Sequence, residues 1–326
     1  MDIGTRLIKA VEVSLEENAT RLTKFHFAEI DFPLGREKTG EALKTLLEKF
    51  RPGTKSVNIS LSAPSAIVRF ISMPEMKEDD LKNSLRFEAE KYIPFNISEV
   101  FIDAVIIPGK AGETKQMRVL LAAAKKEAVY ACLAMLKEAG LSASLADIDS
   151  FACFNAFCNS FRKLDESKST ALLNIGYTHT NVLVLRGDQP FFTRDIQTGS
   201  KDIAKAVSAE FQVGEKEADK LIFNPGENAL RVFEVAKGVL NDFVEELRLS
   251  FGYYENQYGS TINEIYLSGG AAHLGGISGH LEENFGVKPV LWDPFAGFER
   301  SPDIDKKLLE PARPHFAVAA GLAMRR

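Results

Sequence analysis

The sequence predicts an α/β protein of two related halves, with a small α+β subdomain inserted in the first half. Each half opens on a glycine turn that precedes a β hairpin arm, at residues 2–5 and 174–180. A third glycine turn, at residues 268–270, joins a short apolar strand to an amphipathic helix. Residues 65–142 mix short strands with helices over a length typical of a small subdomain.

The apolar pattern up to residue 64 predicts strands and one helix. Phe25 and Phe27 alternate with polar residues, as they do in a half-buried strand. Leu43, Leu46 and Leu47 fall on one side of a helix, because a helix has 3.6 residues per turn. The elements expected here are strands at 3–13, 21–30 and 55–61 and a helix at 39–50.

The inserted segment is divided by proline and glycine. Pro74 ends a first strand, Pro94 ends a charged helix and Gly140 closes the last helix, since proline interrupts regular structure and glycine favours helix ends. The elements expected here are strands at 67–71, 100–107 and 117–124, helices at 77–92 and 126–139, and a turn at 108–112.

The remaining elements return the chain to the first half and then build the second. A β segment at 141–149, an apolar helix at 151–161 and a polar linker at 162–169 come first. We then expect strands at 171–175, 181–185, 189–196 and 264–268 and helices at 200–211, 215–222, 227–257, 277–285 and 316–324. The last helix consists mainly of small residues, which suits tight packing.

The composition is that of a globular protein and excludes several functions. A chain of 326 residues with 45% hydrophobic and 26% charged residues can bury a large core and favours two domains. The net charge of −5 and the lack of a Lys/Arg-rich run argue against nucleic acid as a partner. No apolar run has the length of a membrane span, and no signal-peptide pattern is present. Three scattered cysteines without a C-x-x-C pair argue against zinc and disulfides and suit a reducing cytoplasm.

The three glycine turns are candidate phosphate loops, because glycine lets backbone N–H groups approach a ligand closely. In the first turn Gly4 permits the bend, Thr5 offers a hydroxyl and Lys9 offers a positive charge. The residues alone leave a second interpretation open, in which all three are ordinary turns and Lys9 is an exposed surface residue. The candidates are Asp2, Gly4, Thr5 and Lys9, then Gly176, Tyr177 and Thr178, then Ser268, Gly269 and Gly270.

Longer motifs resemble one protein family over nearly the whole chain. They are Met73-Pro74-Glu75-Met76, residues 87–95, Asp147-Ile148-Asp149, Ile175-Gly176, residues 185–188, residues 264–286 and residues 316–323. In this order they resemble the PilM family of type IV pilus assembly proteins, an FtsA-like branch of the actin-like ATPase superfamily. The resemblance implies the actin-like ATPase fold, with the subdomain of residues 65–142 as the FtsA-type insertion.

The resemblance implies a division of the chain into four parts. The first half comprises 1–64, continued by 141–165 and by a C-terminal helix at 311–326. The inserted subdomain comprises 65–140. The core of the second half comprises 166–200 and 260–310, and a helical subdomain at 201–259 completes it.

The resemblance also implies ATP with Mg²⁺ between the halves. The first two turns would hold the phosphates, with Asp2 contacting Mg²⁺ through water, and the third would pack on adenosine. A bulky residue at Gly269 is therefore expected to block adenosine by overlap. Glu217 and Lys220 would contact ribose and adenine; a solvent-facing ion pair at spacing i,i+3 is the other interpretation. Asp149 is a candidate for holding water or metal, or for capping a helix.

Three features depart from the family pattern. Met1 directly precedes Asp2, so either the start codon is misassigned or the first strand is cut short, which would weaken the first loop. Asn174 stands where many actin-like proteins have aspartate, and it lacks the charge that holds Mg²⁺ through water, so hydrolysis is in doubt. Nothing follows Arg326, whereas FtsA-like proteins carry an amphipathic membrane helix there, so direct membrane insertion is not expected.

The partner implied by the resemblance is the N-terminal cytoplasmic tail of a PilN-like inner-membrane protein. Such a tail would lie between two sheets as an extended peptide and would hold the protein at the inner membrane from the cytoplasmic side. Self-association is also possible in this superfamily. The residues proposed for the tail are Ile67, Leu81, Leu85, Tyr92, Pro94 and Phe95, and the alternative is that they only pack the subdomain core.

Two other functions compete with a nucleotide-binding scaffold. A small-molecule kinase of the same superfamily would need a catalytic aspartate and a polar substrate pocket, and the 65–142 insertion does not suit it. A nucleotide-free structural homologue from a type II secretion-like system would usually be followed by a transmembrane segment. If the protein hydrolyses ATP at all, the neutral Asn174 predicts slow turnover.

Overall fold

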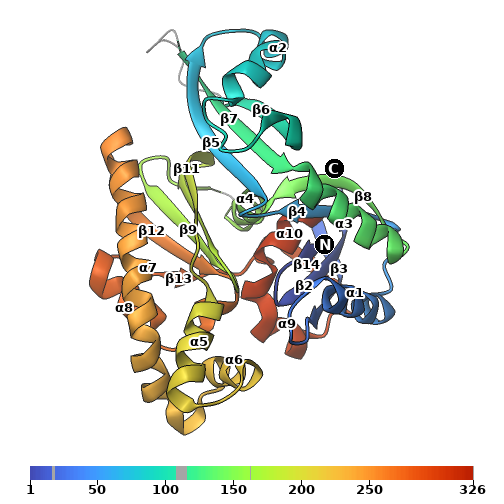
Figure 1. Ribbon diagram of the computed structural model, residues 1–326, viewed down its shortest axis with the longest axis vertical. Coiled ribbons are helices and arrows are strands. Elements are labelled where there is room, and N and C mark those ends of the chain that lie inside the picture. The colour runs from blue at the N-terminus through green and yellow to red at the C-terminus, as the bar shows by residue number, and fades with distance from the viewer. Residues whose placement is uncertain (17–18, 108–115, 162, 326) are drawn as a thin grey trace.

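The computed structural model describes residues 1–16, 19–107, 116–161 and 163–325, and it has two large lobes with a small subdomain above the first (Figure 1). The expected turn at 108–112 lies outside the described residues. The first lobe contains a four-stranded sheet of order β1-β2-β3-β14 and a parallel pair β4-β8. Its elements are β1 (Asp2–Ile3), β2 (Leu7–Leu15), β3 (Thr20–Glu29), α1 (Arg36–Phe50), β4 (Ser56–Leu61), β8 (Ser142–Ile148), α4 (Asp149–Ser160), β14 (Phe298–Arg300), α9 (Lys306–Ala312), η4 (Arg313–Phe316) and α10 (Ala317–Ala323).

The C-terminal segment completes the first lobe. β14 pairs in parallel with β3 at Phe298–Arg300, so this strand belongs to the first lobe and not to the second, where the sequence placed residues up to 310. α10 crosses α4 so closely that a Cβ at Gly321 would lie 1.6 Å from the carbonyl oxygen of Ala152. The small residues of the last helix therefore serve the tight packing that the sequence predicted.

The subdomain is a three-stranded antiparallel sheet of order β5-β7-β6 with one helix on one face. Its elements are β5 (Ala66–Pro74), α2 (Glu78–Ala89), η1 (Ile97–Glu99), β6 (Val100–Ile107), β7 (Gln116–Lys125) and α3 (Lys126–Glu138). Leu81 and Leu85 of α2 pack with Ile71, Val119 and Leu121 of the sheet in one apolar cluster. α3 instead buries Leu136 in the core of the first lobe and so links the subdomain to it.

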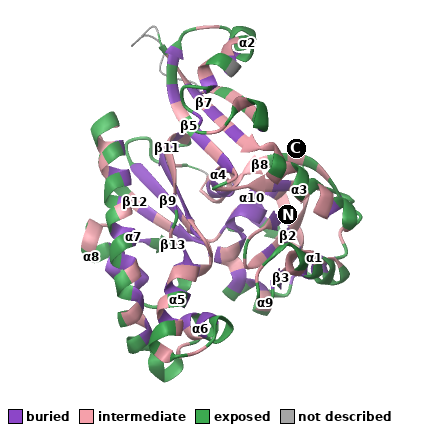
Figure 2. Cartoon of the chain, viewed as in Figure 1, coloured by how far each residue is buried: buried purple, intermediate pink, exposed green. Residues whose placement is uncertain are grey.

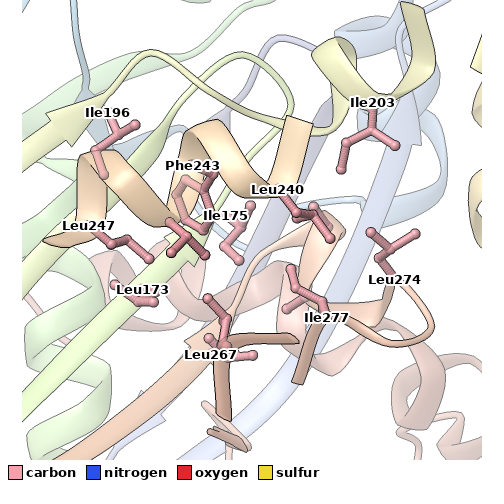
Figure 3. Close-up of a cluster of buried hydrophobic side chains, with 14 of the residues drawn as sticks. Leu173, Ile175, Ile196, Ile203, Leu240, Phe243, Leu247, Leu267, Leu274 and Ile277 are labelled. Atoms are coloured by element: carbon pink, nitrogen blue, oxygen red, sulfur yellow. The ribbon is translucent and has the colours of Figure 1, made fainter. Parts of the chain in front are cut away.

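The second lobe is a five-stranded sheet of order β11-β10-β9-β12-β13 covered by helices. Its elements are β9 (Ser169–Ile175), β10 (Thr180–Arg186), β11 (Gln189–Ile196), α5 (Ser200–Phe211), α6 (Glu215–Phe223), η2 (Gly226–Asn228), α7 (Ala229–Tyr258), β12 (Ile262–Ser268), η3 (Gly270–His273), α8 (Ile277–Phe285) and β13 (Val290–Leu291). Leu240, Phe243 and Leu247 of α7 lie over Leu173 and Leu267 of the sheet (Figure 3).

The other face of the second-lobe sheet packs against the first lobe. Leu172 and Leu183 of this face share a cluster with Phe157 of α4, Phe316 before α10 and Leu22 of β3. Buried residues therefore run continuously from one lobe to the other, while the outer faces of α2 and α7 are exposed (Figure 2). This shared core fixes the two hairpins of the lobes opposite one another.

Candidate functional site

A cavity of about 780 Å³ lies between the two lobes. Both hairpin turns reach it, and the hydroxyl oxygens of Thr5 and Thr178 approach each other to 3.3 Å across it. Of the twelve residues predicted to bind nucleotide, ten line this cavity: Asp2, Gly4, Thr5, Lys9, Gly176, Tyr177, Thr178, Lys220, Gly269 and Gly270. The fold thus brings three turns that are distant in the sequence to one cavity. Ser268 and Glu217, the other two predicted residues, do not line it.

The first turn places a buried ion pair at the cavity. The Gly4 N–H donates to the Leu7 carbonyl at 3.1 Å, and a Cβ at Gly4 would lie 2.9 Å from the same oxygen. The strands pair Asp2 opposite Lys9, and the Lys9 Nζ lies 2.6 Å from the Asp2 carboxylate, with both side chains largely buried. Lys9 is therefore a fixed positive charge in the cavity wall and not a free surface lysine.

The second turn is tied to the start of α5. The Gly176 N–H donates to the His179 carbonyl at 3.0 Å, and the N–H groups of Ser200 and Lys201 donate to the carbonyls of Gly176 and Tyr177 at 3.0 and 2.8 Å. Thr178 keeps its hydroxyl 3.2 Å from His179 Nδ1. These bonds hold the turn rigidly, with Thr178 directed at the opposite lobe.

Asn174 is the centre of a hydrogen-bonded chain of side chains. Its amide nitrogen donates to Asn181 Oδ1 at 3.1 Å, and Asn181 donates to Asp195 at 2.7 Å. Ser268 donates to Asn174 Oδ1 at 3.3 Å, so both ends of the amide are occupied. Ser268 is buried and orients Asn174 from behind the cavity wall, which explains why this predicted ligand residue does not line the cavity.

Gly269 is required by the path of the chain. Its φ is +87°, and a Cβ there would lie 2.3 Å from the carbonyl oxygen of Ile175. A side chain at Gly269 would therefore clash with the main chain of the neighbouring strand β9, whether or not adenosine is bound. Gly270 is different, because a Cβ there would meet the imidazole of His315 at 3.1 Å.

Gly269→Ala is expected to lower the free energy of unfolding by more than ~2 kcal/mol, because it combines a positive φ with a main-chain clash. Gly238→Ala is the matched control: Gly238 lies inside α7 with nothing within 4 Å of an added Cβ. That variant should gain about 0.5–1 kcal/mol. Urea unfolding of both variants decides the point, and an undiminished stability of Gly269→Ala would refute this role.

Helix α6 contributes a different set of residues from the one that was predicted. Lys216, Asp219 and Lys220 line the cavity, whereas Glu217 is exposed and faces Lys220 at 3.6 Å, as in a surface ion pair. The spacing i, i+3, i+4 from Lys216 is the signal that sequence reasoning missed. Both flanking residues Ala218 and Ile222 are buried, which fixes the direction of this polar face.

Asp219 also joins the lobes through Arg6, the residue after the first turn. Arg6 Nε donates to Asp219 Oδ2 at 2.9 Å, and both side chains are largely buried. Arg6 further donates to the Ile30 carbonyl and to Glu29, each at 2.8 Å. The other carboxylate oxygen of Asp219 is buried and has no hydrogen-bond partner among the described residues. Asp219 therefore lines the cavity and retains an unused acceptor oxygen, which is covered in this structure.

Asp149 is a buried carboxyl in the cavity wall. Burial, followed by the negative charge of Asp2, raises its pKa from the usual 3.8 to about 7. The Lys9 ammonium opposes this shift. Asp149 is the first residue of α4 and lies at the expected strand–helix junction near the cleft, but the N-cap is Ile148 and no side chain caps the helix, so the expected capping role of Asp149 was wrong.

The raised pKa of Asp149 predicts a pH dependence of stability. Between about pH 4 and 7 the folded protein keeps a proton that the unfolded chain has released, so the stability contribution of the neutral carboxyl is lost as pH rises through 7. Asp149→Asn, which stays neutral, should be more stable than the wild type at pH 8 and nearly equal to it at pH 4. Thermal unfolding across this range, with Asp303→Asn at an exposed position as control, measures it. A constant difference between variant and wild type would contradict the assignment.

The cavity provides few direct ligands for a metal ion. No group of three or more His, Cys, Asp or Glu side chains suited to a metal occurs in the described ranges. Asp2 is engaged by Lys9, and Asn174 and Asn181 are amides. Asp2 and Asp149 are carboxylates in the cavity wall, and they suit a hydrated Mg²⁺ that is also held by ligand phosphates, as Mg²⁺ commonly is.

The residues predicted for the partner lie mostly in the subdomain core. Leu81 and Leu85 are buried between α2 and the subdomain sheet. Ile67 and Phe95 pack against the apolar cluster that they form there. Tyr92 and Pro94 are exposed, close to where α2 ends. Four of the six predicted residues therefore pack in the subdomain core, which was the alternative interpretation of the sequence.

The opposite face of the subdomain sheet exposes a different apolar surface. Phe101 and Val105 of β6 are 44% and 55% exposed, and Tyr130 and Leu133 of α3 are 57% and 37% exposed. Phe101 and Tyr130 meet edge to face with ring centroids 5.9 Å apart. We call these four residues the docking face. β6 pairs with β7 alone within the described part of the chain, so its outer edge has no strand partner, although the Ala104 N–H of β6 already donates to the Asp103 side chain at 2.9 Å.

No helix within the described ranges combines the length and the apolar character that crossing a lipid bilayer requires.

Comparisons with known proteins identify the fold. This chain is similar to a solved structure described as a PilM-PilN type IV pilus biogenesis complex. The match covers 99% of this chain and 96% of the solved chain, with 29% sequence identity and a TM-score of 0.89. The ethanolamine utilization protein EutJ from Carboxydothermus hydrogenoformans is similar over 99% of this chain and 87% of its own, with 15% identity and a TM-score of 0.54. The chain has the actin-like ATPase fold. A family model described as type IV pilus assembly protein PilM matches residues 1–326, so the chain belongs to the PilM family of type IV pilus assembly proteins.

Proposed function

We propose that this protein is a cytoplasmic scaffold of type IV pilus assembly that binds ATP between its lobes and a PilN-like tail on its subdomain. The single observation that carries this proposal is the meeting of three glycine turns from both lobes around one cavity. The name of the most similar solved structure reported above pairs a PilM protein with PilN. The proposal extends that pairing to this chain.

The cavity suits ATP in size and in chemistry. Ligand sites typically measure about 300–1,000 Å³, and this cavity has about 780 Å³. Thr5, Thr178 and Lys9 would hold the phosphates, and the unused oxygen of Asp219 would accept a hydrogen bond from a ribose hydroxyl once the Arg6 contact adjusts. Asp219 takes the place of Glu217 in this proposal. Bound Mg²⁺ would neutralise phosphate charge, with Asp2 and Asp149 contacting its water shell.

ATP turnover is expected to be slow. Asn174 is neutral, and its amide already donates to Asn181 and accepts from Ser268, so it offers no charged group that would activate an attacking water. We expect phosphate release well below the ~1–1000 per second of ordinary enzymes. A coupled phosphate assay on the purified protein measures this rate. Turnover within that range, abolished by Lys9→Met, would contradict the scaffold proposal and favour an ATPase.

The docking face is the proposed site of the tail. An extended peptide would add to the free edge of β6 through its main chain and place alternate apolar side chains against Phe101, Val105 and Tyr130. These residues are exposed before any partner binds, whereas Leu81 and Leu85 would have to leave their core. The proposal therefore retains the subdomain predicted from the sequence and changes the residues within it. Binding there would hold the protein at the inner membrane without lipid contact of its own.

Two binding measurements and a phosphoryl-transfer screen separate this function from its competitors. Co-expression with the PilN-like protein of the same organism should yield a stable complex on purification. Calorimetric titration with ATP and Mg²⁺ should show one site per chain. A complex that forms while ATP fails to bind would favour the nucleotide-free homologue, and transfer of phosphate to a small molecule would favour the kinase. Failure of both measurements would leave only the fold. Self-association stays untested and is read from the elution volume of the same preparation.

A further inference from the structure

Two histidines form a part of the cavity wall that neither the phosphate loops nor Asp219 occupies. His273 ends η3 and His315 lies in η4, so they come from the two lobes and meet at the cavity. Their imidazole rings stack with centroids 5.7 Å apart and planes inclined by 27°. The two rings thus form one stack built from both lobes, with the His273 ring beside a face of the His315 ring.

The position of His315 is fixed by the third glycine turn. The Gly269 N–H donates to the Pro314 carbonyl at 2.7 Å, which ties η4 to this turn. Because Gly270 has no side chain, the His315 ring lies directly against its main chain, where an added Cβ would stand 3.1 Å from Cε1. The ring is therefore held in place before any ligand arrives.

Both imidazoles are neutral at physiological pH. Burial lowers the pKa of His273, and it lowers the pKa of His315 to about 4, with smaller effects from Lys9 and His273. A neutral aromatic surface attracts an uncharged ring by stacking and offers no charge to a phosphate. The cations of the cavity are instead Arg6, Lys9, Lys216 and Lys220. The wall therefore has the chemistry of a base-binding surface.

We propose that His315, backed by His273, is the surface on which the base of a bound nucleotide stacks. This contact makes His315 the residue that favours a nucleotide over bare polyphosphate, while the glycine turns bind both. The inference rests on the proposed nucleotide function and goes beyond it by assigning base recognition to one residue. Stacking of this kind tolerates different bases, so GTP should bind through the same surface.

The test compares ATP with inorganic tripolyphosphate, each with Mg²⁺, by calorimetry at pH 7.5. His315→Ala should weaken ATP binding by about five- to 150-fold, the range of base–aromatic stacking, and leave tripolyphosphate affinity unchanged. His315→Phe keeps a ring and should restore most of the ATP affinity. His26→Ala is the matched control, because His26 lies in β3 outside this cavity.

Four outcomes would overturn the inference. Equal weakening of ATP and tripolyphosphate binding by His315→Ala would make His315 a general support of the cavity. ATP affinity unchanged in His315→Ala would remove His315 from the site. If His315→Phe loses as much affinity as His315→Ala, stacking is excluded. A wild type that binds neither ligand would overturn the proposed nucleotide function itself, and this inference with it.

Discussion

Val105→Arg is expected to weaken binding of the PilN-like tail peptide by at least about 30-fold. This is roughly the loss of affinity that follows removal of a central interface contact. Val105 is 55% exposed, so the free protein can hold arginine there without strain. A bound peptide would cover this position and strip the guanidinium of water without supplying a counter-charge. Calorimetry with a peptide of the tail sequence measures the loss.

Leu230→Arg is the matched control for this variant. Leu230 is 84% exposed in the first turn of α7, in the second lobe and outside the subdomain. Both variants should unfold at the temperature of the wild type. If Val105→Arg binds the peptide as the wild type does, the docking face is not the site of the tail.

Lys9→Met is expected to weaken ATP binding by about 10- to 150-fold, because hydrogen bonds to charged groups contribute about 1.5–3 kcal/mol each. Methionine keeps most of the apolar stem of lysine and removes only its charge. The change also leaves the buried Asp2 carboxylate without its partner, 2.6 Å away in the wild type. Removing one member of a buried pair typically costs about 3–5 kcal/mol of stability.

The double variant Asp2→Asn with Lys9→Met separates the two effects. It contains no buried charge at this position, so its stability should return toward that of the wild type. Its ATP affinity should stay low, since the phosphate contact is still missing. Recovery of ATP binding together with stability would show that Lys9 acts only through the fold.

The fold was accessible from the sequence because its signals are local. Glycine at residues 4, 176 and 269 marks turns whose main-chain approaches exclude a side chain, and these turns appear where the sequence predicted them. The helix expected at 77–92 ends at Ala89 instead, and the chain then tightens into a turn in which Lys91 and Tyr92 donate to carbonyls three residues back. β14 was misplaced because a three-residue strand has too little periodicity to indicate which sheet it joins.

The site was only partly accessible, because its remaining residues are defined by contacts across the cleft. The spacing of Lys216, Asp219 and Lys220 puts Asp219 on the cavity face of α6, but its contact with Arg6 of the other lobe cannot be inferred from α6 alone. His315 meets the cavity through the hydrogen bond between Gly269 and Pro314, which joins residues 45 positions apart in the chain. A single sequence contains no signal for either contact.

The docking face illustrates a different limit. Apolar residues on α2 and on β6 look alike in sequence, and only the packing of α2 against Val119 and Leu121 tells which side of the sheet it covers. Once α2 occupies one side, Leu81 and Leu85 are buried, and Phe101 and Val105 remain on the open side. Choosing between these two sets therefore required the packing of the subdomain.

Amide hydrogen exchange of the purified protein, with and without saturating tail peptide, tests the central claim most directly. The account predicts slower exchange in β6 (Val100–Ile107), whose free edge the peptide would pair with, and in α3 (Lys126–Glu138). Exchange in α7 (Ala229–Tyr258) should not change. Peptide binding that slows exchange elsewhere and leaves β6 unchanged would contradict the account.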